Sequence, residues 1–516
     1  MTPLEGVVRL ADQNAYSAFA ARFLPHAGRR FVESFDGRTF SYDDLHRLTA
    51  QMAGLLARHG VRKGDRVAGL LHKSPEAIML YFAAVRSGAL YMPVSSALTP
   101  PEVAYLMRDA GPRVAICAPE REATLQSIAK ACGIERIFTL DGSGRGSFGA
   151  EFAGLDPDFD PVACSGRDGN AIVYTSGTTG KPKGAVISNG LAVTNAIALG
   201  EAWQFDRDDV LLHSNPPAFS IFGTTTPVVA CGASMILLPK FDAGSVVSLL
   251  PRATVFAGVP TYYSRLLERA DFTRAACARM RLFITGSAPM RPDLFTAFME
   301  RSGHVLLDRY GLTETLLVTS NPVDGERESG DSGVPLPGVE LRIVDDTGAL
   351  VAEGEIGAIE VRQPYMFNGY WNAPEKTRQA FRPDGYFITG DFGKRTRNGH
   401  VAVLGRGTEL IITGGLNVYP KEVEERINAF DNVSDCAVIG VPHPDFGEGV
   451  VAIVELRDAA LGLDQRQLLE RLRGELAGFK VPKKLVVLRE LPRNALGKIQ
   501  KNVLRESHAG AFSAAR

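Results

Sequence analysis

The first part of the chain alternates short apolar runs with segments of helical periodicity, and this alternation limits the fold more than any other feature. The runs at 66–71, 90–94 and 113–117 have the length and composition of buried strands. Segment 40–60 instead repeats apolar residues at three- and four-residue spacing, as amphipathic helices do, and a second helix is predicted at 75–87. Such β-α-β alternation predicts a parallel sheet flanked by helices.

The same alternation continues in the middle of the chain. Strands are predicted at 210–212, 234–238, 254–259 and 281–285, with helices around 191–201, beyond 222 and over 242–250. The strands run into polar or glycine residues, among them Ser214, Gly258 and Gly286. Because ligands of open α/β sheets bind at the carboxyl ends of strands, we expect these points to meet in one crevice.

The last third changes character. Alternating runs at 339–344 and 356–361 predict a small antiparallel β region. Beyond Gly405 about a hundred residues, enough for an independent domain, contain helices predicted at 420–429, 463–476 and from 501, and strands at 436–441, 450–456 and 484–488. The predicted fold class is therefore mixed α/β: a large N-terminal domain of β-α-β sheets with a small β region, and a small α+β C-terminal domain. We expect 142–167, rich in Gly, Asp and Ser, to be a surface connection.

Composition narrows the function. A chain of 516 residues should split into at least two domains. Its net charge of −1 does not show the excess of positive charge that is typical of proteins that bind nucleic acid. The six cysteines stand singly, which argues against a zinc or redox motif and favours a reducing compartment. Neither a signal peptide nor an apolar run of membrane-spanning length is recognisable, so we expect a cytoplasmic protein without membrane contact that acts on small molecules.

The glycine-rich stretch 174–184 has the chemistry of a phosphate grip. Between Thr175 and Gly184 it holds three glycines, four hydroxyl residues and two lysines. Glycines let successive backbone N–H groups point inward to form an anion nest. Flexible connectors are also rich in Gly, Ser and Thr, but this density of donors and positive charge favours phosphate binding. The spacing is not that of a P-loop.

Five further stretches could join this loop, although each alone has a structural explanation. They are 308–315, 386–391, 405–407, 414–424 and 492–498. The first offers an aromatic face at Tyr310 for a base and a carboxylate at Glu314 for Mg²⁺, or is merely a capped turn. Asp391 could bind ribose hydroxyls, or be a turn residue, and Lys498 could reach an anion, or be a solvated charge.

The set as a whole, in this order, resembles the adenylate-forming enzymes, which comprise acyl- and aryl-CoA synthetases, nonribosomal-peptide adenylation domains and luciferases. The resemblance covers nearly the whole chain. It implies an N-terminal domain over 1–406 with the ATP and acid sites, and a mobile C-terminal domain over 407–516 with a catalytic lysine. It also implies an AMP-forming acid–thiol ligase that uses ATP, Mg²⁺ and coenzyme A.

The resemblance assigns roles residue by residue. The β- and γ-phosphates would be bound by Thr175, Ser176, Gly177, Thr178, Thr179, Gly180 and Lys183. Adenine would stack on Tyr310, with Asp308 and the segment Gly286, Ser287 and Ala288 at its edge, and Gly311 would belong to the same cofactor site. Ribose would be bound by Asp391 and Arg406, the α-phosphate by Thr313 and Mg²⁺ by Glu314. Lys498 would stabilise the adenylation transition state, and Gly414 and Gly415 would face the pantetheine thiol after rotation of the C-terminal domain.

Two points stay open at this stage. The family generally has Asp or Lys two residues after the hinge arginine, where this chain has Thr408. The thiol could belong to coenzyme A or to an acyl carrier protein, and a non-catalytic nucleotide-binding protein on the same fold is the alternative of a different class. The retained Glu314, Asp391 and Lys498 argue against that last alternative.

Within the family, stretches such as 72–77, 238–242 and 481–484 are similar to those of malonyl-CoA synthetases. A second carboxylate needs a cation, for which Arg281 is the candidate. The expected acid pocket comprises Phe219, Ser220, Phe222, Val259, Arg281, Gly286 and Leu312. Malonyl-CoA synthetases typically carry histidines where Ser220, Ile221 and Phe222 stand here, so we predict a more apolar pocket and a shifted acid, such as a substituted malonate or a monocarboxylate.

Overall fold

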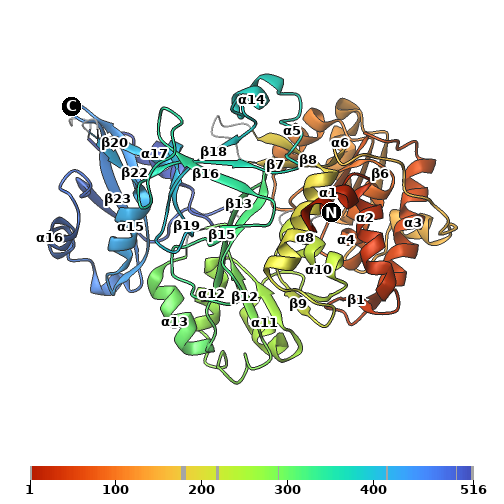
Figure 1. Cartoon of the computed structure of the whole chain (residues 1–516), viewed down its shortest axis with the longest axis horizontal. Coiled ribbons are helices and arrows are strands. Elements are labelled where there is room, and N and C mark those ends of the chain that lie inside the picture. Colours follow the sequence, from red (N-terminus) through yellow and green to blue (C-terminus); the bar gives the residue numbers. More distant parts are fainter. Residues whose placement is uncertain are drawn as a thin grey trace.

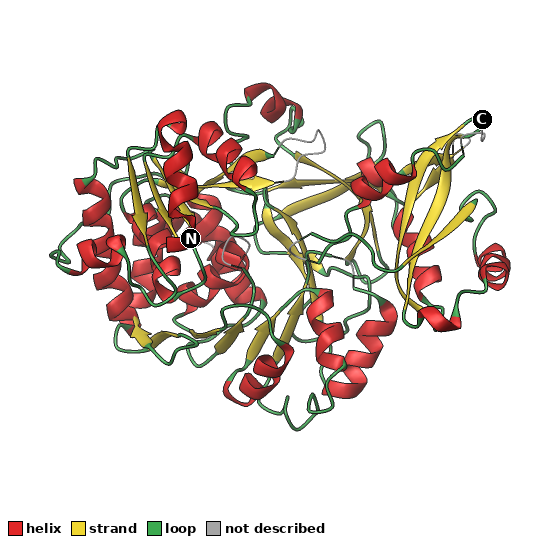
Figure 2. Cartoon of the chain, turned by 180° about the vertical axis from the view of Figure 1, so that it is seen from behind, coloured by secondary structure: helices red, strands yellow, loops and turns green. Residues whose placement is uncertain are grey.

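The computed structural model describes residues 3–175, 182–216, 220–288, 290–413, 416–494 and 497–512. Four sheets make up the fold (Figure 1), and the elements from β20 onward, in blue, stand at one end of the molecule. Seen from behind, helices surround the strands of the larger part (Figure 2). The predicted mixed α/β class, with a large N-terminal and a small C-terminal domain, is confirmed.

A six-stranded sheet forms the first unit. Its order is β6 (Arg136–Thr139), β5 (Val114–Cys117), β3 (Arg66–Leu70), β4 (Leu90–Pro93), β7 (Gly169–Thr175) and β8 (Lys183–Ser188). Strand β3 is parallel to both β4 and β5, as the alternation predicts. Its helices are α3 (Tyr42–Arg58), α4 (Pro75–Arg86), α5 (Pro100–Ala110) and α6 (Glu122–Cys132). Ser41 and Asp44 form the predicted capping box of α3.

A nine-stranded sheet forms the second unit. Its order is β15 (Val334–Pro335), β14 (Leu316–Ser320), β13 (Leu307–Leu312), β12 (Leu282–Thr285), β11 (Val255–Ala257), β9 (Val210–His213), β10 (Ser234–Leu237), β1 (Arg30–Glu33) and β2 (Thr39–Ser41). The five strands from β13 to β10 are mutually parallel, so their carboxyl ends share one edge. The associated helices are α1 (Pro3–Ala11), α2 (Ala15–Phe23), α8 (Asn189–Ala202), α10 (Thr226–Cys231), α11 (Ala243–Leu249), α12 (Pro260–Leu267) and α13 (Pro292–Ser302).

Two smaller sheets complete the chain. The predicted antiparallel region consists of β16 (Glu340–Val344), β17 (Gly357–Arg362), β18 (Phe387–Arg395) and β19 (Val401–Arg406), with α14 (Pro374–Gln379) between β17 and β18. The C-terminal sheet has the order β21 (Leu416–Val418), β20 (Ile411–Thr413), β23 (Gly447–Leu456) and β22 (Val433–His443), with β24 (Lys484–Leu488) paired to β23. Helices α15 (Pro420–Asn428), α16 (Gln465–Glu475) and α17 (Lys501–His508) accompany it.

One predicted segment is wrong. The stretch expected as a plain surface connection contains the helix α7 (Ser147–Ala153). Phe148 is fully buried and Phe152 nearly so, and the two rings pack edge to face at 5.5 Å. Two aromatic anchors therefore hold a helix that is too short to show a clear apolar period. Along the described stretches of chain, none of the helices combines the length and apolarity needed to cross a membrane.

Candidate active site

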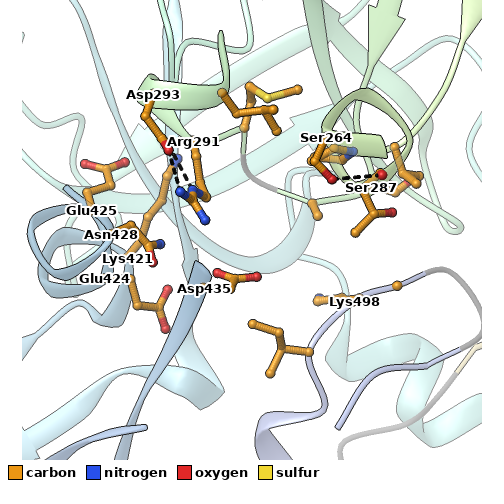
Figure 3. Close-up of a pocket in the computed structure, with 18 of the residues that line it drawn as sticks. Ser264, Ser287, Arg291, Asp293, Lys421, Glu424, Glu425, Asn428, Asp435 and Lys498 are labelled. Carbon is orange, nitrogen blue, oxygen red and sulfur yellow. Dashed lines mark hydrogen bonds and ion pairs between the residues drawn. The ribbon is translucent and has the colours of Figure 1, made fainter. Parts of the chain in front are cut away.

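A cavity of about 1430 Å³ lies between the N-terminal sheets and the C-terminal elements. Residues that follow β11 and β12 line it, among them Val259, Ser287 and Ala288, as expected for the shared carboxyl edge of the parallel strands. Lys498 reaches it from the C-terminal side. Figure 3 shows Lys498 facing the wall that carries Ser264 and Ser287. The cavity is therefore built by both domains.

A buried carboxylate with two donors stands on this wall. Asp391 and Arg406 are register partners in the antiparallel pair β18–β19, and Arg406 Nε lies 3.0 Å from Asp391 Oδ1. The Tyr310 hydroxyl donates to Asp391 Oδ2 at 2.6 Å. Burial raises the pKa of Asp391, which is 4% exposed, while Arg406 and Tyr310 partly offset this effect. The structure thus brings together three predicted nucleotide-site residues that lie far apart in sequence.

A second buried acid lies at the start of β13. Burial raises the pKa of Asp308 to about 7, although the backbone N–H of Arg309 donates to its carboxylate at 2.7 Å. Because β12 and β13 are parallel neighbours, Ser287 and Ala288 follow β12 beside this acid. A Cβ at Gly286 would lie 2.7 Å from the Arg309 guanidinium, so a larger residue there would require the arginine side chain to move. The predicted edge of an adenine site is thus assembled in one place.

The phosphate loop and the predicted metal ligand meet through a tyrosine. Thr175 and Lys183 pair across the β7–β8 hairpin, and Lys183 Nζ lies 5.4 Å from the ring centroid of Tyr370. The Tyr370 hydroxyl donates to Glu314 Oε1 at 2.8 Å, and Thr313 precedes Glu314 in the β13–β14 turn. Sequence reasoning missed Tyr370, which links the two sheets here. The other predicted loop residues lie outside the described residues: Ser176, Gly177, Thr178, Thr179 and Gly180.

The lysine-bearing loop rests against the N-terminal domain. Lys498 is exposed, and its backbone N–H donates to Asn494 Oδ1 at 3.0 Å. Gly497 has a φ of +77°, and a Cβ there would lie 2.9 Å from Thr261 Oγ1 of α12. Burial raises the pKa of Asp391, and the positive charge of Lys498 offsets part of that rise. Gly414 and Gly415, the residues predicted to face a thiol, lie outside the described residues.

The predicted acid-pocket residues fall into two groups. Val259 lines the cavity, and Gly286 and Leu312 lie at the adjoining strand ends. Ser220 and Phe222 are buried at a five-residue π-helix, Ile221–Thr225, a distortion that is frequent at functional sites. Phe219, which was also predicted to line the acid pocket, lies outside the described residues.

The position of Arg281 does not support its predicted role as a ligand for a second carboxylate. Its guanidinium forms an ion pair with Asp209 at 2.5 Å and donates to the carbonyl of Trp203 at 2.9 Å. It precedes β12, whereas Gly286 follows that strand, so the two lie at opposite ends. Proximity in sequence was misleading because a strand carries the chain away from its starting point. Arg281 instead neutralises a buried aspartate.

Replacement of Arg281 by glutamine should lower the free energy of unfolding by about 2 to 3 kcal/mol and leave the order of preferred acids unchanged. Asp209 would stay buried without its cation, and the partial exposure of Arg281 keeps the cost below that of a fully buried pair. Urea unfolding measures the first effect, with Arg279→Gln, an exposed neighbour, as the control. A changed acid preference in a stable variant would restore Arg281 to the acid site.

Sequence reasoning also missed a buried lysine. Lys73 Nζ lies 3.2 Å from the carbonyl oxygen and 3.3 Å from Nδ1 of His213, and His213 Nε2 lies 3.4 Å from Thr225 Oγ1. Burial lowers the pKa values of Lys73 and His213 well below their ordinary ranges. Among the described residues, no carboxylate contacts this ammonium. Because the partners are 140 residues apart, no local pattern could have revealed the pair.

Arg265 on α12 is a further cation that the sequence did not single out. It is exposed and lines the cavity, and within the described ranges no carboxylate pairs with it. Arg265 lies one helical turn after Thr261, the residue in contact with the lysine loop. The signal available in the sequence was this four-residue spacing. It places Thr261 and Arg265 on the same face of a helix that starts directly after Val259.

Comparisons with known proteins agree with this geometry. Residues 19–371 match the AMP-binding enzyme family, and residues 422–498 match the family of the AMP-binding enzyme C-terminal domain. The chain is 35% identical to an indoleacetate–CoA ligase of Aromatoleum aromaticum, over 92% of this chain and 94% of that protein. It is 32% identical to the mitochondrial malonate–CoA ligase ACSF3 of Mus musculus, over 90% and 86%.

Among solved structures, ATP-bound MatB from Rhodopseudomonas palustris is similar over 97% of this chain and 99% of its own, with 44% identity and a TM-score of 0.94. The apo structure of the same protein gives a TM-score of 0.83 at the same identity and coverage. The arrangement of this chain therefore differs more from the apo structure than from the ATP-bound one.

Proposed function

Because the chain belongs to the AMP-binding enzyme family and is an acid–CoA ligase of the AMP-forming class, we propose that it joins a small carboxylic acid to coenzyme A in two steps. The acid attacks the α-phosphorus of ATP, and the bond to pyrophosphate breaks. The thiol then attacks the acyl carbon, AMP leaves, and the thiol proton is released. In this proposal the two domains meet at Arg406, spanning 1–406 and 407–516.

The observation that carries the proposal is the buried carboxylate of Asp391 between Arg406 and Tyr310. Its oxygens lie on the wall of a cavity large enough for a nucleotide and suit the two hydroxyls of ribose. The Tyr310 ring, with Gly311 behind it, would stack on adenine, and Asp308 with Ser287 and Ala288 would border the base. Nucleotide binding measured by calorimetry tests this step.

The phosphates would extend from this nucleotide end toward Lys183. Lys183, with Thr175 and the rest of the loop, would hold the β- and γ-phosphates, and Thr313 the α-phosphate. Glu314 fits Mg²⁺ because it is a carboxylate next to the phosphate path, and only its Oε1 is engaged by Tyr370. The ion would neutralise phosphate charge there. Glu314 and Thr313 would act together with Lys498, which lines the cavity beside Tyr310 and Gly311.

Lys498 would supply the positive charge at the reacting centre. The attack of a carboxylate on a phosphate brings two anions together, so charge neutralisation contributes more to the rate than covalent help from the protein. In the second step, rotation of the C-terminal domain would withdraw Lys498 and present Gly414 and Gly415 to the pantetheine thiol. One cavity would then serve both steps.

For the acid we propose a substituted malonate, with a monocarboxylate as the second candidate. Phe222 is buried against Tyr81 at 5.7 Å, and the Ser220 hydroxyl already donates to the Pro216 carbonyl at 3.0 Å, so this segment offers an apolar wall. A second carboxylate needs a cation, and Arg265 is available on α12. The named acids of the relatives, malonate and indoleacetate, span both properties.

A panel of acids tests this choice. Pyrophosphate release should be faster with methylmalonate than with malonate, octanoate, benzoate or indoleacetate, because the methyl group gains apolar contact while Arg265 neutralises the second carboxylate. Arg265→Leu should lower kcat/KM for the dicarboxylate by about 100-fold and that for monocarboxylates by less than threefold. A clear preference for malonate would refute the shifted pocket. Preference for a monocarboxylate would remove the role of Arg265.

Two alternatives have their own tests. A carrier protein's phosphopantetheine could accept the acyl group in place of coenzyme A, because both present the same thiol arm. Mass spectrometry of a carrier protein incubated with enzyme, ATP and acid would detect the transfer. A non-catalytic nucleotide-binding protein would bind ATP without acid-dependent pyrophosphate release.

A further inference from the structure

A cluster of charged groups joins the two domains at the start of α13. It lines the same cavity as the proposed nucleotide site but consists of other residues. Arg291 and Asp293 stand at the start of α13, where Arg291 Nε donates to Asp293 Oδ1 at 2.9 Å. From the C-terminal domain, Arg457 Nη2 lies 3.3 Å from Asp293 Oδ2. Arg291 Nη1 donates to the carbonyl oxygen of Ser434, also in the C-terminal domain. Among the described residues, Arg457–Asp293 is the only ion pair between the two domains.

These contacts are made by one end of a rigid element. Ser434 lies at the start of β22 and Arg457 directly follows β23, and the two strands form the longest antiparallel pair of the C-terminal sheet. The Nε atom of Arg457 also donates to the carbonyl oxygen of Val433 at 3.1 Å. The N-terminal domain therefore contacts one end of the rigid C-terminal sheet. A shift of these contacts would move the sheet together with the residues attached to it.

The lysine loop is attached to the same end of the sheet. Arg493 Nη2 lies 2.8 Å from Asp435 Oδ2, and Arg493 Nη1 donates to the Gly497 carbonyl at 3.1 Å. Asp435 is the neighbour of Ser434, and Gly497 is the neighbour of Lys498. A continuous chain of contacts thus runs from Asp293 on α13 to the lysine that faces the nucleotide site. Figure 3 shows Arg291, Asp293, Asp435 and Lys498 around the one cavity.

We propose that the cluster of Arg291, Asp293 and Arg457 is an interdomain latch that positions Lys498 for the adenylation step. The proposal rests on the proposed function, because it assigns the latch to the first of the two steps. The latch has to open before the C-terminal domain can turn. Loss of the latch should therefore slow formation of the acyl adenylate and spare its conversion to the thioester.

The groups around Asp293 suit a latch that holds and releases. Burial acts to raise the pKa of Asp293, but the hydrogen bond and charge of Arg291, with Arg457 behind them, lower it below its ordinary value. Asp293 is therefore ionised at neutral pH and both arginines remain attracted to it. Side-chain exposures of 43% for Asp293 and 53% for Arg457 make the interdomain pair weak enough to open.

The test separates the two half-reactions. Acid-dependent exchange between ATP and pyrophosphate should fall about tenfold in Arg291→Gln and about threefold in Arg457→Gln. Formation of thioester from supplied acyl adenylate and coenzyme A should stay within twofold of wild type, and Arg457→Lys should recover most of the exchange rate. The control is Arg473→Gln, an exposed arginine of α16 in the same domain. Equal losses in both half-reactions, or none in either, would overturn the proposal.

A readout independent of activity separates this proposal from the proposed function. In small-angle X-ray scattering with ATP, the wild-type protein should fit the arrangement of Figure 1, and the Arg291→Gln/Arg457→Gln double variant should show a larger radius of gyration at unchanged melting temperature. Identical scattering of the two proteins would refute the latch even if no acid supported exchange. Absence of exchange in the wild type with every acid, together with the expected scattering, would refute the proposed function alone.

Discussion

Replacement of Lys498 by alanine should lower the rate of acid-dependent ATP consumption by about 10²- to 10³-fold while nucleotide binding persists. Lys498 is the exposed cation that the C-terminal loop places at the cavity, and its charge offsets part of the rise that burial causes in the pKa of Asp391. Two anions approach one another in the adenylation step, so a missing positive charge acts on the transition state more than on bound ATP. Pyrophosphate release and calorimetric ATP titration measure the two quantities separately.

The matched control for this variant is Lys484→Ala. Lys484 is an exposed lysine of β24, and its ammonium donates to the Ala511 carbonyl at 3.1 Å. It should keep wild-type activity. Retention of more than a tenth of the wild-type rate by Lys498→Ala would show that another group carries the charge. Loss of ATP binding in the same variant would assign Lys498 to ground-state binding.

Replacement of Asp391 by asparagine should lower kcat/KM for ATP by about 100-fold, with a smaller effect on the KM for the acid. The carboxylate holds both Arg406 and the Tyr310 hydroxyl, and each hydrogen bond to a charged group contributes about 1.5 to 3 kcal/mol. Tyr310→Phe removes one of these donors and should cost about tenfold. Steady-state kinetics with ATP as the varied substrate measures both.

The pH dependence of this site has a defined direction. Burial raises the pKa of Asp391, so the ionised form that holds Arg406, and that would bind the ribose in the proposed function, is lost at a higher pH than for an ordinary aspartate. The KM for ATP should therefore rise as the pH falls toward that raised pKa, and Asp391→Asn should flatten this rise. Asp346→Asn, at an exposed turn, serves as the control. An unchanged acid limb in Asp391→Asn would remove Asp391 from ATP binding.

Much of the fold follows from apolar periodicity. The helix predicted at 75–87 is observed as Pro75–Arg86, and the strand predicted at 484–488 as Lys484–Leu488. The helix begins at a proline and is buried along its whole length, and the strand is a short run rich in β-branched residues, so boundaries and composition carry these two predictions beside periodicity. The helix Ser147–Ala153 was missed because seven residues hold only two anchoring aromatic side chains.

The geometry of the proposed nucleotide site was predictable only where sequence motifs carry its residues. Tyr310, Asp391 and Arg406 were singled out from separate stretches, and the structure brings them within hydrogen-bonding distance. Arg281 was misplaced because its partner, Asp209, is 72 residues away and its strand leads away from the pocket. Contacts between sheets, such as those of Lys73 with His213, depend on how two units dock. No spacing along one segment encodes that docking.

The contact between Lys73 and His213 bears on the rigidity of the proposed acid pocket. Lys73 follows β3 of the six-stranded sheet and His213 ends β9 of the nine-stranded one, so the ammonium adds a buried polar contact to the apolar core that the two sheets share. Pulling them apart would strand a buried amine without acceptors, at a cost of several kcal/mol. The sheets therefore move as one unit, and new substrates have to be accommodated by exchanging wall side chains. Moving the two sheets apart would be the more costly way to accept a broader range of acids.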